Sequence, residues 1–76
     1  MLIVTGAAGF IGSCMLKKLN NEGFNDILAI DDFSIKAKNK NLLNKTYRGR
    51  LERDKLFGWL KDNKTAVSGI MHLGAR

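Results

Sequence analysis

The chain has 76 residues, is 45% hydrophobic, and carries 13 lysines and arginines against 7 aspartates and glutamates. This length accommodates one small domain, and the mixed composition argues against a disordered or low-complexity chain. No apolar run approaches the roughly 20 residues that a membrane-spanning helix needs. The start of the chain lacks the basic segment of a signal peptide, and a single cysteine excludes an internal disulfide and a cysteine-based metal cluster. The composition therefore predicts a soluble cytoplasmic domain.

The first thirty residues predict a strand, a helix and a second strand. Residues 2–4 form a short apolar run typical of a strand buried on both faces of a parallel sheet. An apolar residue then recurs at every fourth position from residue 11 to 19, with Cys14 beside this stripe, which indicates an amphipathic helix with Cys14 buried. Gly23 suits a left-handed cap that ends the helix. Residues 27–30 form the second apolar run, so the segment is a βαβ unit.

The second half of the chain has a weaker pattern. We expect a short helix at residues 42–43 and a brief third strand at residues 46–48. Helical spacing returns over residues 56–60, where the tryptophan is expected in the core. Residues 67–73 then predict a fourth strand, with Gly69 at a point where a neighbouring backbone or helix approaches closely. Parallel strands with right-handed crossovers give an α/β fold with a sheet of about four strands, in the order 3-2-1-4, flanked by helices.

Three glycines at a spacing of three, Gly6, Gly9 and Gly12, join the first strand to the first helix. Such a turn needs residues without a Cβ, and it leaves backbone N–H groups at the helix start open to a pyrophosphate. Asp31 follows at the end of the second strand, where an acidic side chain accepts hydrogen bonds from an adenosine ribose. The pattern predicts a partial Rossmann fold that binds a dinucleotide. The alternative is that the glycines serve only a tight turn and close packing.

The net charge of +6 arises within residues 36–55, which hold eight lysines and arginines against two acidic residues. This segment is either a solvated face or an anion site. We do not expect this segment to bind nucleic acid, because Tyr47 is the only aromatic residue among its basic residues. Asp31 favours NAD, whereas Lys38 and Arg53 favour the 2′-phosphate of NADP. We expect NADP, with NAD tolerated.

The Thr-Gly-x-x-Gly-x-x-Gly loop at residues 5–12 resembles that of the extended short-chain dehydrogenase/reductase superfamily. Within it, residues 20–28, 31–33 and 72–75 resemble the ADP-L-glycero-D-manno-heptose 6-epimerases of the NAD-dependent epimerase/dehydratase family. The resemblance implies pyrophosphate contacts at the glycine loop, ribose contacts at the paired aspartates, 2′-phosphate contacts at two cations, and further contacts after the fourth strand. The cofactor-binding residues so implied are Gly6, Gly9, Phe10, Ile11, Gly12, Asp31, Asp32, Lys38, Arg53, Leu73, Gly74, Ala75 and Arg76.

The same resemblance implies an isomerase that inverts C6 of an ADP-heptose by transient oxidation and hydride return, and so supplies heptose for the lipopolysaccharide core. It further implies a homo-oligomer that binds a nucleotide sugar but neither nucleic acid nor a membrane. Members carry a catalytic Tyr-x-x-x-Lys pair, whereas Tyr47 here is followed by Leu51. Residues 1–76 are therefore expected to be the N-terminal part of a dinucleotide-binding domain, without catalytic and substrate-binding parts, and inactive alone.

Three other interpretations stay open from the residues themselves. The chain could belong to another sugar-nucleotide epimerase or dehydratase, form a non-catalytic dinucleotide-binding module, or be a basic nucleic-acid-binding domain. His72 lies at the end of the expected fourth strand, and we interpret it as structural. No residue is assigned to catalysis or to a metal, because a lone histidine and a lone cysteine do not make a ligand set.

Overall fold

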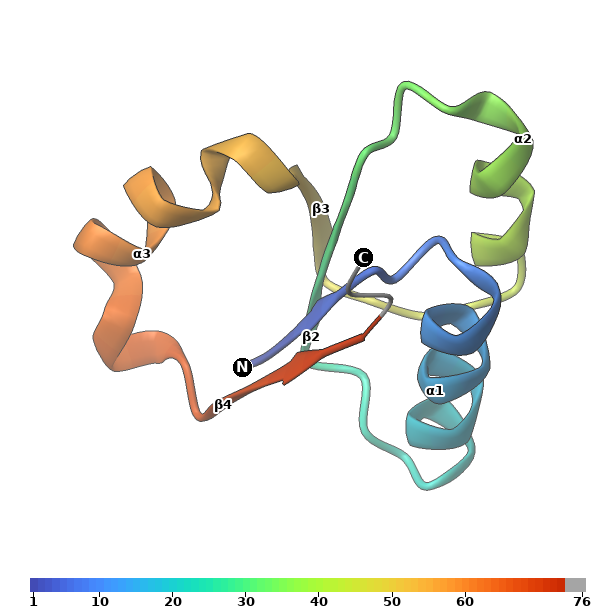
Figure 1. The fold of residues 1–76 in the computed structure, drawn as a ribbon. Helices are drawn as coiled ribbons and strands as arrows, with labels where there is room; N and C mark the ends of the chain where they lie inside the picture. The colour runs from blue at the N-terminus through green and yellow to red at the C-terminus, as the bar shows by residue number, and fades with distance from the viewer. Residues whose placement is uncertain (74–76) are drawn as a thin grey trace.

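Two apolar strands, β1 (Leu2–Thr5) and β2 (Ile27–Asp31), pair in parallel at the centre of a sheet. In the computed structural model, which describes residues 1–73, β3 (Gly49–Glu52) adds to β2 and β4 (Gly69–His72) adds to β1 (Figure 1). All pairings are parallel, and the strand order β3-β2-β1-β4 confirms the prediction. Every residue of β2 is buried, because the continuous apolar run of this strand lies between two other strands and is covered on both faces.

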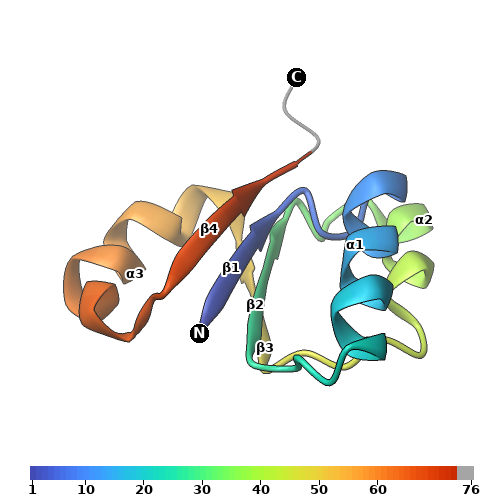
Figure 2. The same ribbon diagram turned by 90° about the horizontal axis from the view of Figure 1, so that it is seen from below.

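The helices cover both faces of the sheet. Helix α1 (Phe10–Asn21) and the short α2 (Lys36–Asn39) lie on one face, and α3 (Leu56–Asn63) lies on the other (Figure 2). Single 3₁₀ turns continue α2 and flank α3: η1 (Lys40–Leu42), η2 (Arg53–Lys55) and η3 (Lys64–Ala66). Among the described residues, no helix has the length and apolar character needed to cross a membrane.

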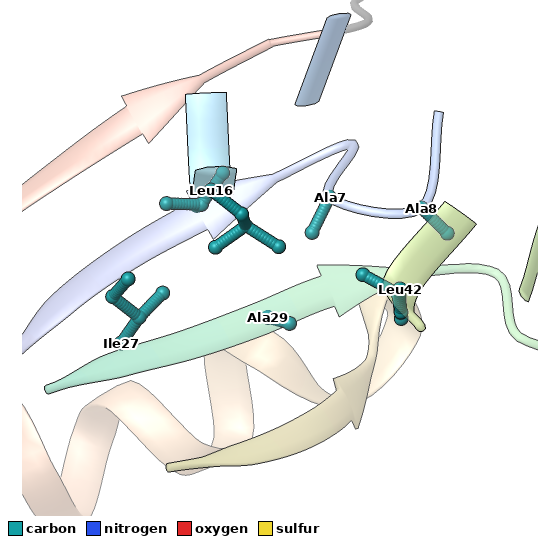
Figure 3. Close-up of a cluster of buried hydrophobic side chains, with 7 residues drawn as sticks. Ala7, Ala8, Leu16, Ile27, Ala29 and Leu42 are labelled. Carbon is teal, nitrogen blue, oxygen red and sulfur yellow. The ribbon is translucent and has the colours of Figure 1, made fainter. Parts of the chain in front are cut away.

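The core on the α1 face is built from small and branched side chains. Ala7, Ala8 and Ala29 present single methyl groups, so Leu16 of α1 and Leu42 of η1 can pack closely over the sheet (Figure 3). On the opposite face, the fully or nearly buried Ile3, Leu28 and Ile30 pack against partly buried residues of and around α3. The sheet is thus the shared wall of two hydrophobic clusters.

The buried face of α1 differs from the predicted stripe. Gly12, Ser13 and Leu16 are buried, whereas Ile11 is 63% exposed and Cys14 is exposed. The physical reason is that α1 approaches the Gly6 turn very closely at Gly12. The helix therefore turns its Gly12 side, and not its Ile11 side, toward the sheet. The prediction of a buried Cys14 was therefore wrong. Gly23 has φ +84° and follows the helix as the predicted left-handed cap.

The third strand begins at Gly49, not at residues 46–48 as predicted. The side-chain amide of Asn20 binds the Thr46 peptide from both sides, accepting its N–H at 2.7 Å and donating to its carbonyl at 2.9 Å. These backbone groups are therefore engaged by α1 and not by the sheet. Sheet pairing starts only after Arg48, whose N–H donates to the Ile27 carbonyl at 2.7 Å.

Three smaller differences concern the end of the chain. Strand β4 begins at Gly69, two residues later than predicted. The nearest atom to a Cβ built at Gly69 is the side-chain Leu2 Cδ1 at 3.4 Å, so no backbone or helix crowds this position. Trp59 packs against the Ile3 cluster as expected, but it is only partly buried, because α3 is the only α-helix among residues 1–73 on this face of the sheet.

Candidate dinucleotide site

The carboxyl ends of β1, β2 and β4 border a cavity of about 760 Å³. In parallel strands these ends lie at one edge of the sheet, and ligands of open α/β sheets bind there. Its walls combine the glycine loop, the strand ends, two cations and an apolar side from α3 and β4. The lining residues are Thr5, Gly6, Gly9, Ile30, Asp31, Lys38, Arg53, Leu56, Phe57, Leu60, Ile70, His72 and Leu73.

Each of the three glycines in the loop has a different structural role. Gly6 has φ +68°, a left-handed conformation that favours glycine. A Cβ built at Gly12 would lie 2.0 Å from the Gly6 carbonyl oxygen, so only glycine lets α1 approach the turn this closely. At Gly9 the same construction gives 3.3 Å, a tight contact that a small shift relieves. Gly6 and Gly9 line the cavity, whereas Gly12 is buried and packs the helix against the loop.

The peptide groups on either side of Ala8 are held by two side chains. The Asp31 carboxylate accepts the Ala8 N–H at 2.8 Å, and the Asn41 side-chain amide donates to the Ala8 carbonyl at 2.9 Å. Asp31 ends β2 and Asn41 belongs to η1, so two elements distant in sequence fix the loop from opposite ends. The loop conformation is therefore preorganised by hydrogen bonds as well as by glycine.

Asp31 is almost fully buried, with 5% of its surface exposed, yet its carboxylate accepts three hydrogen bonds. Besides the Ala8 contact, its Oδ1 accepts the Asp32 N–H at 2.7 Å and the Lys38 ammonium at 2.9 Å. Burial raises the pKa of Asp31, but the hydrogen bond from Lys38 and the two backbone N–H groups outweigh it and hold the pKa below its ordinary value. The carboxylate predicted for the ribose is thus also the anchor of the glycine loop.

The two predicted cations lie at the same cavity, although they are far apart in sequence. Lys38 reaches it from α2, and Arg53 reaches it from η2, directly after β3. The Arg53 guanidinium also helps to lower the pKa of Asp32, whose main cause is the hydrogen bond from the Ser34 hydroxyl at 2.6 Å. Lys38 neutralises Asp31, so this end of the cavity suits an anion even though a carboxylate lines it.

The remaining predicted residues divide into three groups. Phe10 and Ile11 open α1, are 78% and 63% exposed, and are not among the cavity-lining residues. Asp32 is half-buried and also lies outside the lining, beside Asp31. Leu73 lines the cavity, whereas Gly74, Ala75 and Arg76 lie outside the described residues.

Several contacts in and beside the cavity were not predicted from the sequence. Asn41 gives no motif, because its role depends on a contact 33 residues away. His72 and Thr5 form a hydrogen bond of 2.7 Å between Nδ1 and Oγ1, which a polar residue at each of two parallel strand ends could have suggested. The apolar wall of Leu56, Leu60 and related side chains requires knowing which face α3 covers.

Together, the parallel sheet, the glycine turn at the start of α1 and the cavity at the carboxyl edge define a Rossmann-type α/β domain. The sequence model of the NAD dependent epimerase/dehydratase family matches residues 2–76. The chain belongs to this family, whose members depend on a nicotinamide dinucleotide.

Three of the curated relatives that match the chain carry the same name. The ADP-L-glycero-D-manno-heptose-6-epimerase of Nitratidesulfovibrio vulgaris is 43% identical over 77 residues, which cover 99% of this chain and 24% of the relative. The proteins of that name from Brachyspira hyodysenteriae and Fusobacterium nucleatum are 42% and 39% identical, again over 99% of this chain and 24% and 23% of theirs. The chain spans about a quarter of the length of these relatives.

Proposed function

We propose that the chain is the N-terminal, NADP-binding part of an ADP-L-glycero-D-manno-heptose 6-epimerase that contributes heptose to the lipopolysaccharide core. The proposal depends on one observation: Lys38 and Arg53 both line the cavity beside the glycine loop. The chain also aligns over 99% of its length with an epimerase of that name. Residues 1–76 would supply cofactor binding, and the catalytic and substrate-binding parts would belong to the rest of the protein.

The residues fit a dinucleotide in three places. Gly6 and Gly9 leave the backbone uncovered where a pyrophosphate would lie, at the positive end of α1. Lys38 and Arg53 supply cations for a 2′-phosphate. Asp31 in the lining, and Asp32 beside it but outside the lining, would supply carboxylates near the ribose. NAD would fit the same groove with fewer charge contacts, so we expect it to bind more weakly.

When bound, the dinucleotide would supply transient oxidation at C6 of the sugar and return of the hydride to the opposite face. The part of this chain is to hold the cofactor and exclude water beneath it. The apolar side chains of Ile30, Leu56 and Leu60 line the cavity and would exclude water from the side of the cofactor that they cover.

Calorimetry with NADP and NAD tests the cofactor assignment. We expect the double variant Lys38→Ala, Arg53→Ala to lose about 30-fold or more in NADP affinity and only a few-fold in NAD affinity, because charge-assisted hydrogen bonds to phosphate are lost only with NADP. Lys36→Ala with Lys55→Ala is the matched control, since both residues belong to the basic segment, are exposed and do not line the cavity. Equal losses for the two cofactors would contradict the 2′-phosphate assignment.

The epimerase assignment is tested on the longer protein that contains this chain. We expect a Tyr-x-x-x-Lys pair downstream of residue 76, and interconversion of the two C6 epimers of ADP-heptose that NMR can follow. A longer protein that binds NADP but leaves ADP-heptose unchanged would favour another sugar-nucleotide epimerase or dehydratase. A stop directly after residue 76 would favour a non-catalytic binding module.

A further inference from the structure

The single histidine of the chain lies at the cavity and is held there by one hydroxyl group. His72 ends β4, Thr5 ends β1, and the two residues are partners in the sheet register. The ring is exposed and lines the cavity together with Gly6 and Gly9. A ring in this position has one nitrogen fixed by the protein and one nitrogen available to a ligand.

The hydrogen bonds of the Thr5 hydroxyl indicate which ring nitrogen carries the hydrogen. Its Oγ1 accepts the Leu73 N–H at 3.2 Å and has a single hydrogen of its own to donate. Two acceptors compete for it: the Met71 carbonyl at 3.4 Å and His72 Nδ1 at 2.7 Å. The shorter contact has the length of a good hydrogen bond, and the longer one lies at the limit. The length of the shorter contact favours Thr5 as the donor to Nδ1, with the hydrogen of the neutral imidazole on Nε2. The reverse arrangement, in which Nδ1–H donates to Oγ1 and Oγ1–H donates to the Met71 carbonyl, depends on the longer contact.

We propose that His72 is a further binding residue of the dinucleotide site, with Thr5 as its positioning residue: Thr5 holds Nδ1, and Nε2–H donates to the ligand. Within residues 1–73, Nε2 makes no hydrogen bond, so its donor is available. The charged groups that share the cavity are Asp31, Lys38 and Arg53. The inference rests on the proposed function, because it names a contact within the same site.

The strand order decides which part of the ligand His72 meets. Asp31, Lys38 and Arg53 lie toward β2 and β3, on one side of β1 and the glycine loop, whereas β4 lies on the other side. An adenosine bound at the cations and a pyrophosphate over the loop would place the second phosphate and its ribose toward β4. His72 is therefore assigned to that half, where phosphate oxygens and ribose hydroxyls accept hydrogen bonds.

Imidazole ¹⁵N NMR at alkaline pH tests the first half of the proposal without any ligand. Because the chain has one histidine, every imidazole signal belongs to His72. We expect the Nε2–H form to dominate in the wild type and in Thr5→Ser, which keeps the hydroxyl. In Thr5→Val the two tautomers should become mixed. A dominant Nδ1–H form, or the same spectrum in Thr5→Val, would overturn the assignment.

Titrations with NADP and with adenosine 2′,5′-bisphosphate test the ligand contact. The bisphosphate occupies the cation end and lacks the half assigned to His72. We expect His72→Asn, which keeps a polar group near the Nδ1 position but removes Nε2–H, to weaken NADP about tenfold and to change bisphosphate binding by less than about twofold. His72→Gln, which restores an N–H near the Nε2 position, should recover part of the loss.

The outcomes separate this inference from the proposed function. Unchanged NADP affinity in His72→Asn would overturn the contact while NADP binding by the wild type stands. Equal losses for both ligands would show that His72 supports only the fold, and would also overturn it. No NADP binding by folded wild-type chain would overturn the proposed function and the ligand contact together, whereas the tautomer spectra decide the Thr5 contact separately.

Discussion

The carboxylate of Asp31 and the backbone N–H of Ala8 lie 2.8 Å apart, so the end of β2 holds the glycine loop that follows β1. The contact joins the two sequence features of the dinucleotide signature within the protein, before any ligand is considered. Asp31 is 5% exposed, and the hydrogen bond therefore acts in a poorly hydrated environment, where its loss is costly.

Replacing Asp31 with Asn should destabilise the fold by about 2–3 kcal/mol at neutral pH. The amide can accept from only one side, so either Ala8 N–H or Lys38 loses its acceptor. Urea unfolding of the variant and the wild type measures the difference. Asp62→Asn, an exposed change on α3, is the control and should alter stability little. A loss no larger than that of the control would show that the carboxylate does not anchor the loop.

The stability of the wild type should fall in acid. The pKa values of Asp31 and Asp26 are lowered in the folded chain, Asp26 chiefly by its hydrogen bond from Arg48. Groups with lowered folded-state pKa values stabilise the fold above their unfolded-state pKa of about 3.9, and this stabilisation is lost as the pH falls through the folded-state values. Thermal unfolding between pH 7 and pH 2 measures this loss. The difference in Tm between the wild type and Asp31→Asn should become smaller below about pH 4. A constant difference would contradict the assignment.

Asn41→Ala should weaken dinucleotide binding more than it destabilises the fold. The change frees the Ala8 carbonyl and lets the loop relax, but it leaves the buried Leu42 beside it in place. We expect about 1 kcal/mol in stability, from urea unfolding, and about tenfold in NADP affinity, from calorimetry. Asn44→Ala is unsuitable as a control, because Asn44 has φ +64°. Asn21→Ala, at the end of α1, serves instead. Unchanged NADP affinity in Asn41→Ala would contradict a role in positioning the loop.

Three glycine-to-alanine changes should give three different results. Gly12→Ala places a methyl group 2.0 Å from the Gly6 carbonyl oxygen and should cost about 3 kcal/mol or unfold the chain. Gly9→Ala should leave the fold nearly intact and weaken dinucleotide binding, because its methyl group occupies the cavity wall. Gly58→Ala has open space around it in α3 and should stabilise by about 0.5–1 kcal/mol. Urea unfolding measures the stability of all three variants, and calorimetry measures the dinucleotide binding of Gly9→Ala. A stable Gly12→Ala would contradict the close approach of α1 to the turn.

Much of the fold was predictable because its central elements have strong local signals. The apolar runs of β1 and β2, the glycine turn and the cap at Gly23 are short-range patterns, and the handedness of parallel crossovers then gives the strand order 3-2-1-4. The third strand was misplaced because the backbone of Thr46 is bound by Asn20. That contact spans 26 residues, so no local pattern announces it.

The sequence by itself determined the class of site: glycines at residues 6, 9 and 12, an acidic residue at the end of the second strand, and cations at Lys38 and Arg53. Only the tertiary structure decided how these groups are used. It engaged Asp31 with Ala8 and Lys38, brought Asn41 to the loop, turned Gly12 and not Cys14 toward the sheet, and paired His72 with Thr5. The physical reason is that residue type sets what a side chain can donate, accept or bury, whereas its actual partner is set by the packing of elements distant in sequence.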